Sequence, residues 1–239
     1  MSRWITAVWA IGNVFAVAGC QTSPPHESAT ASSVQTKESQ VAMTPEQALG
    51  RLRDGNARFV AGKPIARDLP AEVRATSAGQ YPYAVVLSCL DSRQSTELVF
   101  DQGIGDVFNA RLAGNVLDDD ILGSLEFACK AAGAKLIVVV GHSNCGAVKG
   151  AIDNVEMDHL TGLLARIKPA IASVPDDGQP RTSKNDQFVQ KVADANVHQV
   201  MKEIRERSPI LNGMIEKHQI ALVGGMYDLK TGEVKFFEK

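Results

Sequence analysis

The sequence lacks any concentration of charge and has few aromatic residues. Its 239 residues include 25 Lys and Arg and 27 Asp and Glu, for a formal net charge of -2, and aromatic residues make up only 5%. The two signs are interspersed and no basic stripe is present, which argues against nucleic acid as a partner. The 44% of hydrophobic residues is enough apolar material for a sizeable core. A small or neutral substrate fits this balance better than a polyanion does.

Cysteine is scarce as well, with only Cys20, Cys89, Cys129 and Cys145 in the chain. An even number in an exported protein suggests disulfide bonds, but most of these cysteines have another explanation. Cys20 lies in a processing signal, and Cys89 and Cys145 lie in segments that suit metal ligands. Cys129 lies on the apolar face of a predicted helix, where we expect a small buried residue.

The longest apolar run lies at the N-terminus and is too short and too weakly flanked for a membrane-spanning helix. Residues 1–19 carry a single charge, at Arg3, and the run ends in the letters VAGC at Cys20. This ending resembles the lipobox of bacterial lipoproteins. The resemblance implies a signal peptide over residues 1–19, cleavage before Cys20 and a lipid on its thiol. A plain signal peptide or an uncleaved anchor is the alternative.

A lipid on Cys20 predicts an exported protein, anchored at the cell envelope on the periplasmic side. Gln21 follows the cysteine where an Asp would usually retain a lipoprotein at the inner membrane, which slightly favours the outer membrane. Residues 20–43 are rich in Ser, Thr, Gln and Pro and poor in large apolar groups. Such a segment cannot bury enough surface to offset its ordering entropy, so we expect a flexible tether. Contact with the membrane is then expected through the lipid alone.

Alternating strand and helix patterns begin at residue 44. Thr44 and Gln47 form a capping box around Pro45 at the first helical position, and this helix should end near Gly62. Apolar runs bounded by turn signals predict strands at 83–87, 107–110, 136–140 and 220–223. Helical patterns lie at 120–132, 147–154, 160–171, 186–207 and 209–218.

This alternation favours one α/β domain over residues 44–239. Strands that alternate with helices form a mostly parallel sheet covered by helices on both sides. The run at 136–140 has no polar alternation, as expected of a strand buried on both faces. The ending YDLKTGEVKFFE predicts a hairpin with its turn at 230–232, which adds an antiparallel strand at the edge.

Two chemically distinctive segments come directly after predicted strands. Cys89 lies in SCLDSR after the strand at 83–87, and His142 and Cys145 lie in GHSNCG after the strand at 136–140. Open α/β sheets place their sites at the carboxyl ends of strands. Two thiolates and an imidazole suit Zn²⁺ with a fourth position left open, which is typical of a catalytic site. A closed structural site or a redox site remains the alternative.

Together, CxDSR and HSxCG resemble the signature of the β-class carbonic anhydrases. The similarity covers nearly everything from Thr44 to Lys239, including the segments LRDGNARFVAGK, FDQGIGDVFNARLAGNVLDDDILGSLEFA and YDLKTGEVKFF. The resemblance implies a strand order of 2-1-3-4 with a fifth strand at one edge and an N-terminal helical arm. It also implies a homodimer or a larger homo-oligomer, with the site near the dimer interface.

The same resemblance assigns the site residues by position. It implies one Zn²⁺ per chain on Cys89, His142 and Cys145, with Asp91 and Arg93 as a catalytic dyad. It also implies substrate contacts, in which Gln80 hydrogen-bonds bicarbonate and a narrow pocket is lined by Phe108, Ala113, Phe127 and Gly146.

The implied activity is the reversible hydration of carbon dioxide to bicarbonate and a proton by a hydroxide on zinc. Arg93 would keep Asp91 ionised and oriented toward that hydroxide. If Arg93 released it, Asp91 could become the fourth zinc ligand and close the site. The alternatives are hydrolysis of carbon disulfide or carbonyl sulfide on the same scaffold, and a zinc-binding or redox-sensing protein without catalysis.

Other positions carry weaker expectations. Val86 stands where a bicarbonate-inhibited subgroup has tryptophan, so we expect no regulatory bicarbonate site, although Arg111 matches an arginine associated with it. His159, His198 and His218 are expected at the surface of helices or at their ends.

Overall fold

The computed structural model describes Met1 and residues 34–237. Residues 2–33, which contain most of the expected signal peptide, Cys20 and the first part of the expected tether, lie outside the described residues. None of the helices in the described part is both long and apolar enough to cross a membrane.

Five strands form one mixed sheet in the order β2-β1-β3-β4-β5, as predicted. The four parallel strands are β1 (Ala84–Ser88), β2 (Val107–Arg111), β3 (Leu136–His142) and β4 (Ala221–Tyr227). The short strand β5 (Val234–Phe236) pairs antiparallel with β4, which confirms the predicted hairpin. Every residue of β3 is buried, in agreement with its unbroken apolar run.

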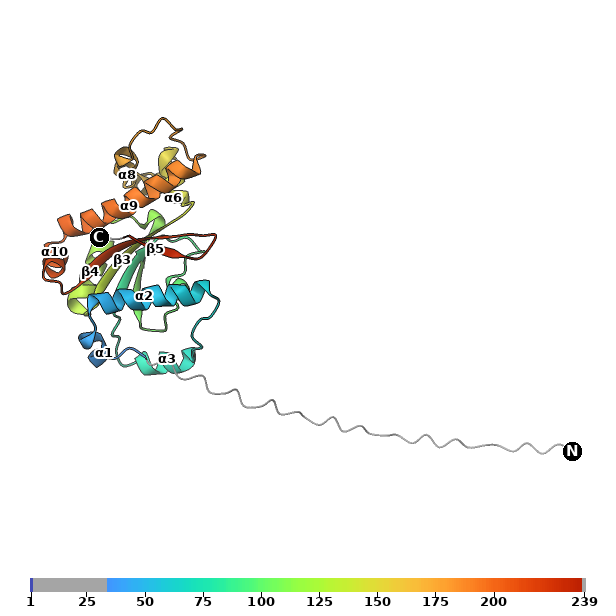
Figure 1. Ribbon diagram of the computed structural model, residues 1–239, viewed down its shortest axis with the longest axis vertical. Helices are drawn as coiled ribbons and strands as arrows, with labels where there is room; N and C mark the ends of the chain where they lie inside the picture. Colours follow the sequence, from blue (N-terminus) through green and yellow to red (C-terminus); the bar gives the residue numbers. More distant parts are fainter. Residues whose placement is uncertain (2–33, 238–239) are drawn as a thin grey trace.

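The sheet lies between two helical layers (Figure 1), and the central strands β1 and β3 contribute residues to the hydrophobic cores on both of its faces. Successive strand residues point to opposite faces. Val85 therefore packs in the core that contains the long helix α9 (Asp186–Arg207). Its neighbour Val86 packs in the other core, which contains α2 (Pro45–Val60).

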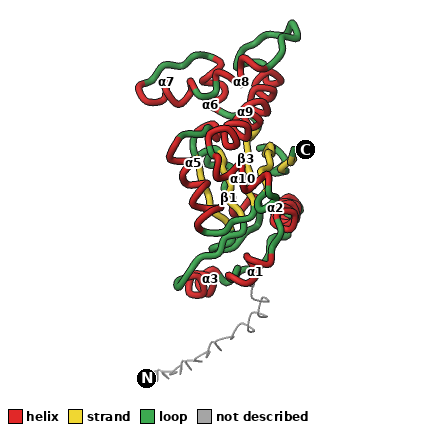
Figure 2. Tube along the Cα trace, turned by 90° about the vertical axis from the view of Figure 1, so that its left-hand side faces the viewer, coloured by secondary structure: helices red, strands yellow, loops and turns green. Residues whose placement is uncertain are grey.

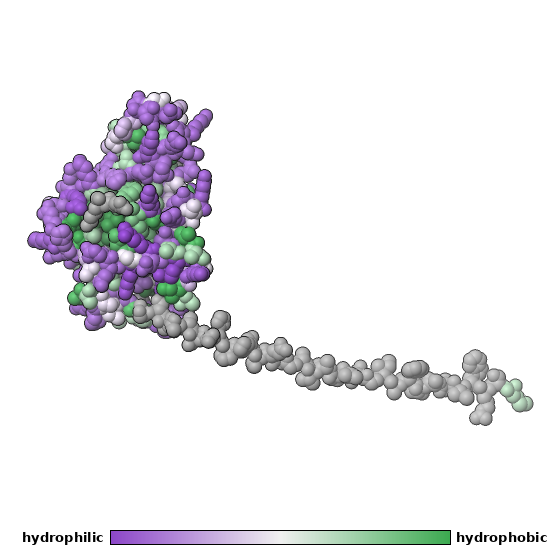
Figure 3. All heavy atoms as spheres, in the orientation of Figure 1, coloured by the Kyte–Doolittle hydropathy of each residue, from purple (hydrophilic) through white to green (hydrophobic). Residues whose placement is uncertain are grey.

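The remaining helices are short, and some of them lie at the two ends of the molecule. They are α1 (Lys37–Ala42), α3 (Leu69–Thr76), α4 (Thr96–Val99), α5 (Asp119–Glu126), α6 (Gly146–Ile152), α7 (Asp158–Ala165), α8 (Lys168–Ser173), α10 (Pro209–Glu216), the 3₁₀ turn η1 (Ala113–Asn115) and the π-helical turn η2 (Phe127–Ala131). Figures 1 and 2 place α6, α7 and α8 at one end and α1 and α3 at the other. In Figure 3, hydrophilic residues cover α8 and α9, and apolar residues gather lower, at the level of the sheet.

The start of α2 matches its prediction. Thr44 Oγ1 accepts a hydrogen bond from the backbone N–H of Gln47, and Gln47 Oε1 accepts one from the backbone N–H of Thr44. The chain leaves the helix through Gly62, whose φ of 66° is a left-handed conformation that glycine adopts without strain. Local signals therefore determine both ends of this helix.

The prediction of a flexible tether is wrong for residues 37–42, because the folded part begins before Thr44. Thr36 caps the helix α1 in a capping box with Ser39. Gln40 is buried, and its Nε2 donates to the carbonyl oxygens of Pro82 at 2.7 Å and Ala132 at 2.9 Å. The composition of this segment, rich in Ser and Gln, did not indicate a folded helix, because the side chain that anchors the helix is itself a polar one.

The single helix predicted over residues 160–171 is also wrong, because two helices, α7 and α8, occupy this stretch. Pro169 explains the break. Proline has no N–H to donate, and its ring clashes with the carbonyl four residues earlier, here that of Ala165. Accordingly α7 ends at Ala165 and α8 begins with Pro169 in its first turn.

Candidate metal centre

Two neighbouring strands bring the three predicted ligands together. Cys89 directly follows β1, His142 is the last residue of β3, and Cys145 follows after a tight turn through Asn144, whose φ is 56°. Because β1 and β3 are parallel neighbours, their carboxyl ends lie at the same edge of the sheet. All three ligand side chains are buried.

The geometry of this cluster fits one metal ion. The two cysteine sulfurs and a ring nitrogen of His142 lie within 4.8 Å of one another. Two sulfurs bound to one tetrahedral zinc at about 2.3 Å are separated by about 3.8 Å, so a single ion can reach all three atoms after small movements. Both cysteines are free thiols, which excludes a disulfide bond between Cys89 and Cys145 in this structure.

The histidine tautomer supports the same interpretation. His142 Nδ1 lies 2.9 Å from the backbone oxygen of Ser143. A carbonyl oxygen can only accept, so Nδ1 carries the proton and Nε2 presents a lone pair. This Nε2 is buried and has no hydrogen-bond partner among the described residues. A metal ion is the partner that such a lone pair suits.

The two thiols compete for one proton. Cys145 donates a hydrogen bond to Cys89, which lowers the pKa of the Cys89 thiol despite the opposing effect of burial. The pKa of Cys145 is raised by the same hydrogen bond and by its own burial. A metal cation that replaced the shared proton would allow both sulfurs to bind as thiolates.

Asp91 and Arg93 form the predicted dyad beside the cluster. Asp91 Oδ1 accepts hydrogen bonds from Arg93 Nε and from its backbone N–H, each at 2.9 Å, and Oδ2 accepts one from Nη2 at 2.7 Å. The bonds from Arg93 outweigh desolvation and hold the pKa of Asp91 well below its usual range. Oδ2 also lies 3.8 Å from His142 Nε2, so this oxygen faces the position of the metal.

A second arginine holds the backbone of the same turn. Arg111 donates from Nε to the carbonyl of Cys89 at 3.0 Å and from Nη2 to the carbonyl of Asp91 at 2.6 Å. The sequence associated Arg111 only with a regulatory site and missed this role. The pairing of its backbone with Ser88 at the end of β1 is what brings it to the turn.

Of the predicted substrate contacts, Ala113 and Gly146 lie next to the metal cluster. Ala113 begins η1, directly after Leu112, whose N–H donates to the carbonyl of Ser88. Gly146 follows Cys145 and is exposed, and a Cβ added there would meet no atom within 4 Å. Gly146 therefore borders open space beside the cluster, whereas Ala113 is partly buried next to it.

Gln80, by contrast, lies far from the metal cluster of its own chain. It precedes β1, whereas Cys89 follows it. The five residues of β1 span roughly 17 Å at about 3.3 Å per residue. Gln80 therefore cannot contact a molecule bound at Cys89 within one chain.

The two predicted aromatic residues contact each other, but at a distance from the ligands. Phe108 and Phe127 pack edge to face with ring centroids 6.2 Å apart, and both line a surface hollow of about 490 Å³. Phe108 pairs with Val85, four residues before Cys89, and Phe127 is 55% exposed. Their hollow is an open surface feature of the single chain.

The remaining expectations about cysteine and histidine are confirmed. Cys129 is buried in η2, and this burial raises its pKa to about 12. His159, His198 and His218 are all exposed, and His198 stacks on the ring of Phe237.

Comparisons with known proteins agree with this arrangement. Residues 84–234, which contain all three ligands, match the family model described as carbonic anhydrase. Carbonic anhydrase 2 of Mycobacterium tuberculosis is 38% identical over 194 residues, covering 79% of this chain and 90% of that protein. The carbonic anhydrase of Mycolicibacterium smegmatis is also 38% identical, covering 80% of this chain and 92% of that protein.

Solved structures show the same fold. A tetrameric β-carbonic anhydrase of Sordaria macrospora superposes with a TM-score of 0.62 at 23% identity, covering 71% of this chain and 87% of that chain. The β-carbonic anhydrase of Coccomyxa in complex with acetazolamide gives a TM-score of 0.61 at 25% identity, covering 70% of this chain and 76% of that chain.

Proposed function

This chain belongs to the β-class carbonic anhydrases, and we propose that it hydrates carbon dioxide reversibly to bicarbonate and a proton, with one zinc ion on Cys89, His142 and Cys145. The observation that carries this proposal is the buried cluster of two thiols and one imidazole, whose Nε2 lone pair has no partner among the described residues. When bound there, zinc lowers the pKa of a coordinated water toward about 7 and so supplies hydroxide at neutral pH.

Asp91 orients the nucleophile in this proposal. Its depressed pKa keeps it ionised at neutral pH, so both of its oxygens only accept hydrogen bonds. Oδ1 is occupied by two donors from Arg93, while Oδ2 takes one and faces His142 Nε2. Oδ2 therefore retains a lone pair that can accept a hydrogen bond from a hydroxyl group on the metal side.

The same position makes Asp91 a candidate fourth zinc ligand in a closed site. Two tetrahedral ligand atoms at about 2.1 Å from zinc are roughly 3.4 Å apart, and Oδ2 is 3.8 Å from His142 Nε2. Once Arg93 released the carboxylate, Asp91 would therefore need only a small movement to bind the zinc through Oδ2. The 59% exposure of the Arg93 side chain leaves it free to move.

Metal analysis combined with stopped-flow hydration of carbon dioxide tests the activity. We expect one zinc per chain and hydration that disappears in Cys145→Ser together with the zinc. In Asp91→Ala the zinc should remain while hydration is lost. Hydration that survived Asp91→Ala would contradict the proposal, and release of hydrogen sulfide from carbonyl sulfide without hydration would favour the alternative hydrolase.

We also propose that a second copy of the chain covers the β2 edge of the sheet. β2 is an edge strand, and an uncovered edge presents unpaired backbone groups that proteins normally protect. Two large apolar side chains in the segments that flank β2 in the sequence are exposed: Leu98, before the strand, is 67% exposed, and Phe127, after it, is 55% exposed. A second copy would also bring its own metal site within reach of Gln80 of the first copy. The Sordaria macrospora relative is described as tetrameric.

Light scattering tests this assembly. Phe127→Glu should dissociate the oligomer and reduce hydration, because a charge would be buried in the interface. Met157→Glu is the matched control, since Met157 is 62% exposed at the start of α7. A wild-type protein that remains monomeric at micromolar concentration would contradict the proposal.

We propose finally that the protein is exported and anchored through a lipid on Cys20, on the periplasmic side of the envelope and preferentially at the outer membrane. Its support is the VAGC sequence after the apolar run. Mass spectrometry of the mature N-terminus should find an acylated Cys20, and Cys20→Ala should move the protein out of the membrane fraction. An unmodified N-terminus would contradict this proposal.

A further inference from the structure

The long helix α9 places an asparagine on its apolar face. Asn196 is 1% exposed, and the other buried residues of the helix are Phe188, Val189, Val192, Ala193, Val197, Val200 and Ile204. Asparagine is a poor residue for a helix interior, and burying its amide costs free energy unless hydrogen bonds compensate. An apolar residue would suit this position better, so the amide calls for a specific explanation.

The amide makes one directed contact, to the turn η1. Asn196 Nδ2 donates to the carbonyl oxygen of Gly114 at 2.8 Å across 82 residues of sequence. Because a carbonyl can only accept, the NH₂ group must face Gly114, and this determines the orientation of the amide. Asn196 Oδ1 is buried without a partner among the described residues, so the amide does not serve a wider polar network.

Gly114 in turn contacts a metal ligand. Its backbone N–H donates to Cys89 Sγ at 3.3 Å. Its φ of 69° is left-handed, and a Cβ added there would lie 2.8 Å from Ile167 Cδ1 and 3.2 Å from Ala147 Cβ. The turn is therefore closely packed, and a side chain at this position would be strained. Cys89 therefore binds the peptide group before the α-carbon of Gly114, and Asn196 binds the peptide group after it.

We propose that Asn196 is a positioning residue for the metal centre, acting through Gly114 on the sulfur of Cys89. By holding the Gly114 carbonyl, it keeps the preceding N–H directed at the sulfur. A hydrogen bond to a thiolate withdraws electron density from it, which matters where two thiolates donate to one cation. The inference deepens the proposed function and rests on zinc binding at Cys89.

Metal affinity and a cobalt spectrum test this role without relying on activity. Asn196→Leu keeps a similar volume and removes the donor, and Asn196→Ala is a second variant in case leucine disturbs folding. We expect the affinity for zinc, measured by competition with a chelator, to fall about 10–100-fold in both variants. With Co²⁺ in place of zinc, the thiolate-to-metal charge-transfer band should shift to lower energy, since the sulfur becomes electron-rich.

Asn56 supplies a matched control. It is a second buried asparagine, whose Nδ2 donates to the carbonyls of Val99 and Gly232 and whose Oδ1 accepts from the N–H of Val234. Asn56→Leu should lower the thermal stability of the metal-free and metal-bound proteins alike, with the cobalt band and the zinc affinity unchanged.

If the Asn196 variants also lost thermal stability while keeping the wild-type cobalt band and zinc affinity, the inference would be overturned, because Asn196 would then be a structural residue only. Failure of the proposed function appears differently. In that case the wild-type protein itself would show no sulfur-to-cobalt band and no zinc bound at Cys89.

Discussion

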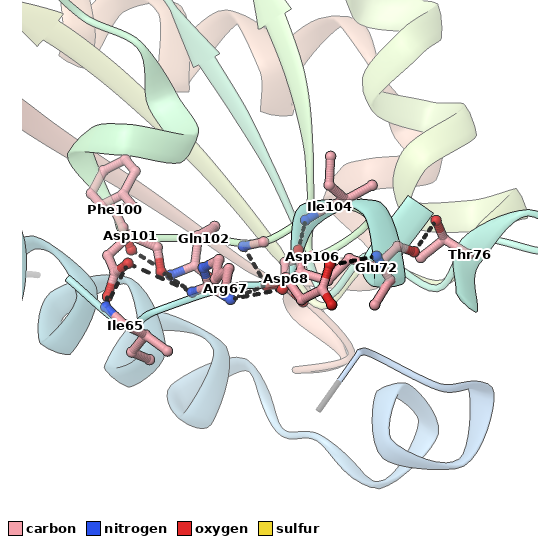
Figure 4. A network of polar contacts seen from close by, with 12 residues as sticks. Ile65, Arg67, Asp68, Glu72, Thr76, Phe100, Asp101, Gln102, Ile104 and Asp106 are labelled. Atoms are coloured by element: carbon pink, nitrogen blue, oxygen red, sulfur yellow. Dashed lines mark hydrogen bonds and ion pairs between the residues drawn. The ribbon is translucent and has the colours of Figure 1, made fainter. Parts of the chain in front are cut away.

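Two buried polar clusters lie at opposite ends of the same sheet, and they differ in whether their charges have partners. At the amino ends of β1 and β2, an ionic cluster joins Arg67 to Glu72, Asp101 and Asp106 (Figure 4). Arg58 Nε completes it with a 2.5 Å bond to Asp101 Oδ2. At the carboxyl ends of β1 and β3 lies the metal centre.

The ionic cluster contains two guanidinium groups and three carboxylates, so most of its charge is paired within the cluster. Asp101 Oδ2 accepts from Arg58, and both of its carboxylate oxygens lie near the N–H of Ile65. Arg67 also donates to the backbone oxygen of Asp101 at 2.6 Å, and Glu72 accepts from the N–H of Ile104. These contacts tie the chain before α3 to the loop that leads into β2, so we assign the cluster to stability.

The metal centre is the opposite case. Cys89, His142 and Cys145 supply only electron pairs once the thiols ionise, and although the charge of Arg93 acts on both sulfurs, its guanidinium makes no hydrogen bond to them among the described residues. Arg93 instead binds Asp91. In this protein, the cluster of electron-pair donors is therefore the candidate ligand site, whereas the cluster that contains its own guanidinium groups has a structural role.

The largest effect separating the two clusters should come from Asp91→Asn. The amide is the same size as the carboxylate, but it brings an NH₂ donor and no charge, so the nucleophile loses its acceptor. We expect kcat/KM for hydration to fall by about 10²–10⁴-fold, as for other groups that handle a proton in the transition state. Zinc content and melting temperature should stay close to wild type. A large loss of stability with full activity would reverse the assignments.

Arg67→Met should have the complementary effect. Removing one partner from a buried ion pair leaves uncompensated carboxylates and typically costs about 3–5 kcal/mol in the free energy of unfolding. Urea denaturation should show this loss, while kcat/KM of the folded protein remains at the wild-type value. Arg74→Met, at an exposed position on α3, which follows Arg67 in the chain, is the control and should change stability little. Equal losses in both variants would refute the structural role of the cluster.

Removal of zinc should lower stability independently of the ionic cluster. A ligand that binds only the folded state stabilises it by about 4 kcal/mol at 1,000 times its dissociation constant. Thermal melts with and without a chelator should show this loss in wild type and an equal loss in Arg67→Met, since distant sites add within roughly 0.5 kcal/mol. A smaller loss in Arg67→Met would mean that the two ends of the sheet are coupled.

Cys129 provides a thiol outside both clusters and the smallest expected effect. Burial raises its pKa from 9.0 to about 12 in the folded protein. Above pH 9 the unfolded chain therefore loses this proton while the folded protein retains it, so stability falls as the pH rises toward 12. The contribution approaches about 1.4 kcal/mol per pH unit. Urea denaturation of Cys129→Ala between pH 9 and 11 should show a shallower decline than wild type, and an identical decline would contradict this effect.

Local signals determined much of the fold. The Thr44 capping box and the apolar run at 136–140 specify α2 and β3 through nearest neighbours and burial, and both appear as predicted. The strand order followed from the family resemblance and is confirmed. Where a prediction was wrong, a single residue overrode the pattern, as Pro169 does between α7 and α8.

The meeting of the three candidate ligands and the pairing of Asp91 with Arg93 could also be predicted, because these residues lie in two short motifs at strand ends. Cys89, His142 and Cys145 needed only the parallel pairing of β1 with β3 to meet. Asp91 and Arg93 are two residues apart, so their hydrogen bonds are almost local.

Only the tertiary structure decided which distant residues support the site. Asn196 reaches Gly114 and so Cys89, Arg111 clamps the Cys89 turn, and Gln40 anchors α1. Each contact joins residues at least 22 positions apart, and a polar side chain in the sequence carries no information about the backbone atom it will meet. Residue types and their spacing therefore determined the chemistry of this protein, and three-dimensional packing determined which groups hold that chemistry in place.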